Sequence, residues 1–219
     1  MGPNLIIFDF DGVIADSEVV ACEVAAAYAT ELGYPLSAEE GLSLFMGKRA
    51  AEVRSMVENH SGKPQPDFEN QLLERTIGAF SRELNPVKGV VAFLDRHSDV
   101  PRCIASSSSH ARLDASLRRL GLTDRFAGAV FSADDVGRGK PFPDLFLFAS
   151  ERMRVDPRSA IVIEDSPAGV MAGKAAGMTT YGILAGSHAR HGLREQLHAA
   201  GADVIVDDFQ TLSQLIDPC

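Results

Sequence analysis

Two aspartates separated by a single residue, Asp9 and Asp11, are the side chains whose types and spacing point most directly to chemistry. They follow the apolar run Leu5–Phe8, which predicts a buried parallel strand. Gly12 then allows a sharp turn and leaves backbone N–H groups exposed beside the carboxylates. Carboxylates next to free amides can hold a hard cation and an anion together, which magnesium-assisted phosphoryl transfer requires. Taken alone, an Asp-x-Asp pair would be read as two solvated turn carboxylates.

The two aspartates can take different parts in such a reaction. Asp9 could attack phosphorus as a carboxylate nucleophile and form an aspartyl-phosphate. Asp11 could give a proton to the leaving oxygen and then accept one from water. These roles require unlike surroundings, with Asp9 ionised beside a metal and Asp11 facing the leaving group.

Two further segments could hold the phosphoryl group. Ser106 and Ser107 follow a predicted strand, where hydroxyl and N–H groups at a helix start can bind phosphate, although a plain serine N-cap is the alternative. Lys140 stands between Gly139 and Pro141, which restrict its backbone. An exposed surface lysine is the usual fate of this residue type. Its charge could instead offset Asp9 and pair with phosphoryl oxygens.

A second acidic pair, Glu164 and Asp165, ends another apolar run. An N-cap for the following helix would account for Asp165 or Ser166. Together with Asp9, the pair also supplies enough oxygen ligands for magnesium, which prefers few carboxylates plus water and phosphate. All four groups fall at the C-terminal ends of predicted parallel strands, the edge where open α/β sheets bind ligands. Their co-occurrence therefore favours a phosphoryl-transfer site more strongly than any single motif does.

The elements that must position these residues follow an alternating pattern. Strands are predicted at residues 5–10, 102–106, 129–132, 160–164, 179–182 and 204–206. Helices are predicted at residues 90–97, 110–120, 144–153, 166–176, 193–200 and 211–216. The alternation predicts an α/β fold in which helices cover both faces of a parallel sheet.

Residues 17–85 interrupt that alternation. Helices are predicted at residues 17–32, 50–58 and 68–84, and a further helix begins at Ser37, where Glu40 completes the spacing of a capping box. We therefore expect an all-helical cap domain at residues 16–87, inserted into an α/β core domain formed by residues 1–15 and 88–219.

Composition narrows the function classes. The chain has 219 residues and a hydrophobic content of 45%. Its formal charge of -9 argues against a nucleic-acid binder, which would normally have a basic surface. No run of 18 apolar residues and no signal-peptide pattern occur, so we expect no membrane span and a cytoplasmic location. Cys22, Cys103 and Cys219 are too widely spaced for a disulfide framework or a zinc site. His188 and His191 are interpreted as solvated loop residues.

The four motifs, Asp9 to Val13, Ser106, Lys140 and Glu164-Asp165, resemble in order and spacing the signature of the haloacid dehalogenase-like superfamily. The resemblance covers essentially the whole chain and implies a Rossmann-like core. The position of the insert is similar to the cap of the group that includes β-phosphoglucomutase and sugar-phosphate phosphatases. The resemblance implies that Mg²⁺ is held by Asp9, the backbone carbonyl of Asp11, Glu164 and Asp165. It also implies that Ser106 and Lys140 hold the phosphoryl group.

Departures from the family patterns narrow the choice of reaction. Haloacid dehalogenases typically lack the second aspartate, which is present here as Asp11. In β-phosphoglucomutase, a histidine near the start of the first cap helix helps control when the acid/base acts, and Ala21 occupies that position here. The position of the arginine in that enzyme's cap loop is occupied by Ala50. We therefore favour a phosphatase for a sugar phosphate or sugar-acid phosphate. The mutase, a dehalogenase or lyase, and a catalytically idle binding module stay as alternatives.

Substrate choice is expected to lie in the cap. Lys48 and Arg49 follow a glycine between two predicted helices and could meet an anionic substrate, while Glu18 could read a hydroxyl. A solvated charge is the alternative for each of these side chains. A small phosphorylated metabolite is the expected partner, with no nucleic acid and no membrane, and a chain of this size is expected to work as a monomer.

Overall fold

The computed structural model describes residues 3–189 and 192–216, so His191 and Cys219 lie outside the described part. The chain divides into two compact units. Unit 1 consists of Met1–Asp16 and Pro86–Cys219, and unit 2 consists of Ser17–Asn85. The first boundary falls after the first strand and its turn, and the chain re-enters unit 1 at Pro86.

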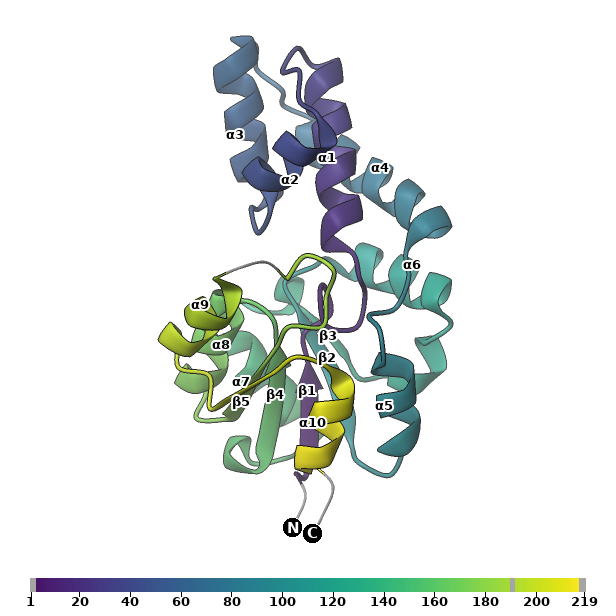
Figure 1. Ribbon diagram of the computed structural model, residues 1–219, viewed down its shortest axis with the longest axis vertical. Coiled ribbons are helices and arrows are strands. Elements are labelled where there is room, and N and C mark those ends of the chain that lie inside the picture. Colours follow the sequence, from purple (N-terminus) through teal and green to yellow (C-terminus); the bar gives the residue numbers. More distant parts are fainter. Residues whose placement is uncertain (1–2, 190–191, 217–219) are drawn as a thin grey trace. The chain divides into compact units, whose positions relative to one another are not determined.

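Unit 1 is built on a parallel sheet with the strand order β3-β2-β1-β4-β5-β6 (Figure 1). Its strands are β1 (Leu5–Phe8), β2 (Arg102–Ser106), β3 (Val130–Ser132), β4 (Ala160–Glu164), β5 (Thr179–Ile183) and β6 (Val204–Val206). The predicted α/β sheet is confirmed. The strand order reverses at β1, and open α/β sheets bind ligands beyond the C-terminal end of the strands at such a switch point.

The register of the central strands brings the polar motifs to one level. Phe8, the last residue of β1, pairs with Ile104 of β2 and Ile163 of β4. Asp9 continues the pairing through its backbone N–H, which donates to the carbonyl of Ile163 at 2.9 Å. The ends of β1, β2 and β4 therefore lie side by side at the same edge of the sheet.

Helices cover both faces of this sheet. The α-helices of unit 1 are α5 (Val90–Arg96), α6 (His110–Leu120), α7 (Asp144–Met153), α8 (Pro167–Ala175), α9 (Leu193–Ala199) and α10 (Phe209–Ile216). Short 3-10 turns occupy η1 (Thr123–Phe126), η2 (Ala133–Asp135) and η3 (Pro157–Ser159). The predicted helix at 211–216 begins two residues earlier than expected, and the others agree within two residues.

Alternate residues of β1 supply the cores on the two faces. Leu5 and Ile7 join a buried cluster that includes Leu145 and Phe146 of α7 and Ala172 of α8. On the opposite face, Phe8 packs edge-on against Phe93 of α5 at 5.9 Å and against Phe126 at 6.2 Å between ring centroids. Burial on both faces explains why the sequence of β1 is continuously apolar rather than alternating.

Unit 2 is a bundle of α1 (Glu18–Glu31), α2 (Ala38–Phe45), α3 (Ala50–Ser61) and α4 (Phe68–Glu83). Ser37 begins α2 with the predicted capping box, in which the Glu40 carboxylate accepts a hydrogen bond from the Ser37 N–H. Tyr28 stacks on Phe68 at 5.0 Å within a core that includes Val57. Helix α3 continues to Ser61, three residues beyond its predicted end.

Among residues 3–189 and 192–216, none of the helices is both long enough and apolar enough to cross a membrane.

Candidate active site

A buried ion-pair network lies at the C-terminal edge of β1 and β4. Lys140 donates to Asp9 Oδ1 at 2.6 Å and to Glu164 Oε1 at 2.7 Å. The exposed fractions of the three side chains are 5% for Lys140, 11% for Asp9 and 0% for Glu164. The Lys140 ammonium also lies 4.9 Å from the ring centroid of Phe146, on α7. Lys140 is therefore buried and paired with two carboxylates. The alternative, an exposed surface lysine, is wrong.

Burial and charge act against one another within this network. Burial raises the pKa of Asp9 well above its ordinary value, with further increases from Glu164 and Asp165, while Lys140 opposes the rise. Burial by itself would lower the pKa of Lys140, but the charges and hydrogen bonds of Asp9 and Glu164 outweigh it and raise the pKa. The lysine therefore stays charged, and its charge favours the ionised form of Asp9.

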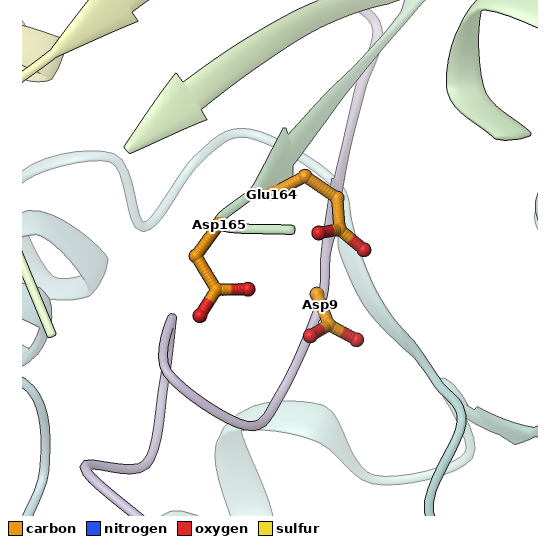
Figure 2. A group of neighbouring side chains, drawn as sticks. All are labelled: Asp9, Glu164 and Asp165. Atoms are coloured by element: carbon orange, nitrogen blue, oxygen red, sulfur yellow. The ribbon is translucent and has the colours of Figure 1, made fainter. Parts of the chain in front are cut away.

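Asp165 adds a third carboxylate to the network. One oxygen from each of Asp9, Glu164 and Asp165 lies within 4.8 Å of the others, and all three residues are buried. Figure 2 shows the three carboxyl groups gathered around a common space at the strand ends. Burial raises the pKa of Asp165, and Glu164 adds to the rise, whereas a hydrogen bond from His188 opposes it.

The donor set of this cluster fits a hard divalent cation. Three buried carboxylates lie together beside the ammonium of Lys140, so the four groups carry an excess of negative charge when the carboxylates are ionised. Burying uncompensated carboxylates costs several kcal/mol for each ion. Oxygen ligands of this kind are those that Mg²⁺ and Ca²⁺ prefer, and a divalent ion would balance the excess charge.

Glu164 is also tied to the protein on its other side. Its Oε2 accepts hydrogen bonds from the Ser166 N–H and the Ser166 hydroxyl, both at 2.9 Å. The Ser166 hydroxyl in turn accepts from the N–H of Gly169 and caps α8, as the helix-cap alternative predicted. Both oxygens of Glu164 therefore accept hydrogen bonds, and Oε1 orients the ammonium of Lys140 beside Asp9.

Asp11 lies on the turn after β1 and contacts two residues of the segment that follows β2. Arg112, in the first turn of α6, donates to Asp11 Oδ1 at 2.6 Å. The Ser108 hydroxyl donates to Asp11 Oδ2 at 2.5 Å. The Arg112 and Asp11 side chains are 21% and 14% exposed. Two donors, one of them a guanidinium, thus fix the position of the carboxylate.

The two predicted phosphate-binding serines occupy different environments. Ser106, the last residue of β2, is 1% exposed, and its hydroxyl accepts from the Ser108 N–H at 3.1 Å. Ser107 is exposed on the turn between β2 and α6. Ser106 lies two residues beyond Ile104, the partner of Phe8, and therefore at the level of the acidic motif that follows β1.

Gly12 has no side chain, and its place in the site requires this. Its φ of +78° lies in the left-handed region, and a Cβ there would lie 1.8 Å from Asp165 Oδ2. A side chain is therefore excluded on two grounds. The Gly12 N–H donates to the Ala15 carbonyl at 2.7 Å within the turn, and phosphate binding at Gly12 stays a prediction.

His188 departs from its interpretation as a solvated loop residue. Its side chain is only 10% exposed, and its Nε2 lies 3.0 Å from Asp165 Oδ2. The loop after β5 brings it to the same edge of the sheet as the acidic residues.

The predicted substrate-reading residues belong to unit 2. Glu18 is the first residue of α1. Lys48 and Arg49 are exposed on the turn that precedes α3. The backbone N–H and the Nε of Arg49 both contact Glu52 Oε2, at 2.9 and 3.3 Å, so part of its charge is balanced within unit 2.

Sequence reasoning missed Ser108, Arg112 and His188. Arg112 lies in the first turn of a correctly predicted helix, and the first turn after β2 must face the carboxyl edge of the sheet. His188 follows the correctly predicted fifth strand by five residues, and its loop reaches the same edge. The strand pattern could therefore have placed Arg112 and His188 at this edge of the sheet, although it does not predict their partners.

Comparison with known proteins places this site in a family. The model of the haloacid dehalogenase-like hydrolases matches residues 6–183. The chain is 31% identical to the phosphorylated carbohydrates phosphatase of Thermotoga maritima, covering 96% of this chain and 97% of that protein. It is 30% identical to the 6-phosphogluconate phosphatase of Escherichia coli, covering 84% of this chain and 83% of that protein.

Solved structures agree with these relatives. A haloacid dehalogenase-like protein of unknown function from Agrobacterium tumefaciens is 36% identical and superposes with a TM-score of 0.85 over 98% of both chains. A hydrolase of the same family from Deinococcus radiodurans, solved with bound phosphate and sodium, is 31% identical with a TM-score of 0.80, covering 100% of this chain and 99% of that one. The match over most of the chain, with the acidic strand ends in place, shows that this protein belongs to the haloacid dehalogenase-like hydrolase family.

Proposed function

We propose that the chain is a Mg²⁺-dependent phosphatase that hydrolyses a sugar phosphate or sugar-acid phosphate through an aspartyl-phosphate at Asp9. The observation that carries the proposal is the environment of this carboxylate. Asp9 is buried at the end of the central strand, holds Lys140 at 2.6 Å and lies beside two further carboxylates. A buried carboxylate paired with an ammonium that favours its ionised form is suited to nucleophilic attack.

In the first step, a carboxylate oxygen of Asp9 forms a bond to phosphorus while the bond from phosphorus to the ester oxygen breaks. The departing oxygen takes a proton from Asp11. Lys140 neutralises charge that develops on the phosphoryl oxygens, which a preorganised cation does more effectively in a dry site than in water. Ser106, exposed Ser107 and the turn that contains Gly12 border the position of the phosphoryl group.

In the second step, water attacks the phosphorus of the aspartyl-phosphate and Asp11 accepts the proton of that water. The bond between Asp9 and phosphorus breaks, inorganic phosphate leaves and Asp9 is restored. In the observed arrangement, both oxygens of Asp11 accept hydrogen bonds. A protonated Asp11 must therefore give up the contact to Arg112 or to Ser108 before it can serve the leaving oxygen.

Mg²⁺ would be held by Asp9, Glu164, Asp165 and the backbone carbonyl of Asp11, the set that the family resemblance implies. When bound, it supplies positive charge that offsets the phosphoryl oxygens and the carboxylates. The three clustered carboxylates support this assignment because they bring more negative charge than Lys140 balances.

The substrate class rests on the relatives. Proteins named for phosphorylated carbohydrates, for 6-phosphogluconate and, in the E. coli hexitol phosphatase A at 31% identity, for hexitols share most of this chain. All three names describe polyhydroxylated carbon chains that carry phosphate. We propose that Lys48 and Arg49 bind an anionic group of the substrate and that Glu18 binds one of its hydroxyl groups.

The reaction is tested by measuring inorganic phosphate release from a panel of sugar phosphates, sugar-acid phosphates and polyol phosphates, with Mg²⁺ and with chelator. Release that requires Mg²⁺ and is restricted to a few of these compounds would support the proposal. Conversion of β-glucose 1-phosphate to glucose 6-phosphate, with a bisphosphate primer and without phosphate release, would instead identify a mutase. No phosphate release and no such conversion would favour a dehalogenase or lyase, or a catalytically idle binding module.

We also propose that the chain acts as a monomer, since unit 1 and unit 2 each have their own buried core. Light scattering at the concentrations used in the activity assay tests this, and a dimer mass would refute it.

A further inference from the structure

We propose that His188 is a positioning residue for the metal site, and that it orients Asp165 by holding its Oδ2 so that the other carboxylate oxygen faces the cation. Nothing in the four sequence motifs assigns a role to this histidine. The inference rests on the proposed metal site, and it deepens that site by naming a residue outside the ligand set.

The contact between the two side chains is close and shielded. His188 Nε2 lies 3.0 Å from Asp165 Oδ2, and the two side chains are only 10% and 6% exposed. Asp165 also belongs to the cluster with Asp9 and Glu164, whereas His188 is not one of its members. Metal-binding carboxylates are commonly oriented by hydrogen bonds from residues that do not touch the metal, and the loss of such residues weakens metal affinity.

The chain makes room for the imidazole ring with two glycines. A Cβ on Gly186 would lie 2.6 Å from both Cε1 and Nδ1 of His188, and 2.8 Å from the Gly12 carbonyl. A Cβ on Gly12 would lie 2.6 Å from His188 Cε1. The ring is therefore enclosed between the turn after β1 and the loop after β5, and neither wall tolerates a side chain.

A second anchor holds the same loop against the turn. The N–H and the hydroxyl of Ser187 donate to Asp16 Oδ1 at 2.9 and 2.8 Å. Ser187 is exposed, whereas its neighbour His188 points inward to Asp165. Adjacent residues thus fix the loop at two points, and a ring held in this way can hold its acceptor in one orientation.

The test is Mg²⁺ binding to the folded chain, measured by titration calorimetry without substrate. His188→Ala is expected to weaken Mg²⁺ binding by about 10–100-fold, the effect of losing a supporting hydrogen bond at a metal site. His188→Gln places an amide N–H near the position of Nε2 and is expected to restore most of the affinity. His198→Ala is the matched control, because His198 is exposed on α9 and should bind Mg²⁺ as the wild type does.

A purely structural role predicts a different pattern. His188→Ala would then lower the melting temperature of the metal-free chain while Mg²⁺ affinity stayed within twofold of wild type, and that result overturns the inference. Failure of His188→Gln to recover affinity would do the same. If His188→Ala does not fold, His188→Asn gives the same comparison, because its amide is too short to reach Asp165.

The outcomes separate this inference from the proposed reaction. A wild-type chain that binds no Mg²⁺ overturns the inference together with the metal site. A wild-type chain that binds Mg²⁺ with the predicted dependence on His188, yet releases no phosphate from any substrate, overturns the proposed function alone.

Discussion

Replacing Lys140 with methionine tests the electrostatic account of the site, because it removes the charge and keeps most of the side-chain volume. The ammonium makes two charge-assisted hydrogen bonds, at 2.6 Å to Asp9 and 2.7 Å to Glu164, and its side chain is only 5% exposed. The variant leaves both carboxylates buried without their cation. Breaking a buried ion pair by removing one member costs about 3–5 kcal/mol.

The same change should slow turnover. Removal of a preorganised group that stabilises charge in the transition state lowers kcat by about 10²–10³-fold, or roughly 2.7–4 kcal/mol. Burial already raises the pKa of Asp9, and Lys140 opposes that rise through both its charge and its hydrogen bond. Without the lysine, the pKa of Asp9 would rise further, and the protonated form that this favours cannot attack phosphorus, which adds to the loss.

Both effects can be measured on the same preparation. Urea denaturation of the metal-free protein gives the change in unfolding free energy, and phosphate release at saturating Mg²⁺ gives kcat. Lys174→Met is the matched control, since the Lys174 pair with Asp203 is 36% exposed on each side and surface pairs contribute about 0–1 kcal/mol. A loss of activity below fivefold for Lys140→Met, or equal effects in the two variants, would refute the reasoning.

Three further changes test separate parts of the site. Asp9→Asn should abolish turnover, since no neighbour can replace the nucleophile, and retention of a tenth of the activity would contradict that role. Replacing Lys48 and Arg49 with alanine should raise KM for anionic sugar phosphates but not for small aryl phosphates, whereas equal effects would place both residues outside substrate recognition. Arg112→Met should misplace Asp11 and slow alkyl phosphates by about 10-fold, part of the 10²–10⁴ of general acid catalysis. Aryl phosphates, whose leaving groups need no proton, should be spared, and a uniform loss on both classes would show that Arg112 has no specific link to Asp11.

The location of the site could be predicted from the strand pattern of the sequence. Runs such as Leu5–Phe8 and Ala160–Glu164 are continuously apolar because both faces of the sheet are covered, and that pattern places the following acids at one edge. The central position of β1 was beyond the pattern, since strand order depends on which helices pack on which face. The capping box at Ser37 was equally predictable because it is formed by residues three apart.

The contacts that specify the site could not be read in the same way. Arg112 and Asp11 are separated by 101 positions, and their pairing depends on how α6 is rotated relative to β1. His188 was interpreted as solvated because no ligand spacing links it to another residue, yet two glycines create its enclosed position. The N–H of Gly12 was expected to be exposed, yet it closes the turn with Ala15. Side-chain direction and local hydrogen bonding, which strand periodicity does not encode, decided all three cases.

The proposed mechanism requires that Asp9 carries the phosphoryl group during turnover. The most direct measurement is mass spectrometry of the peptide containing Asp9 after the enzyme is mixed with Mg²⁺ and a substrate from the panel and quenched in acid within milliseconds. This peptide should gain the mass of one phosphoryl group, and the gain should be absent in chelator and in Asp9→Asn. Turnover with no phosphorylated Asp9 peptide, or with the phosphoryl group on another residue, would contradict it.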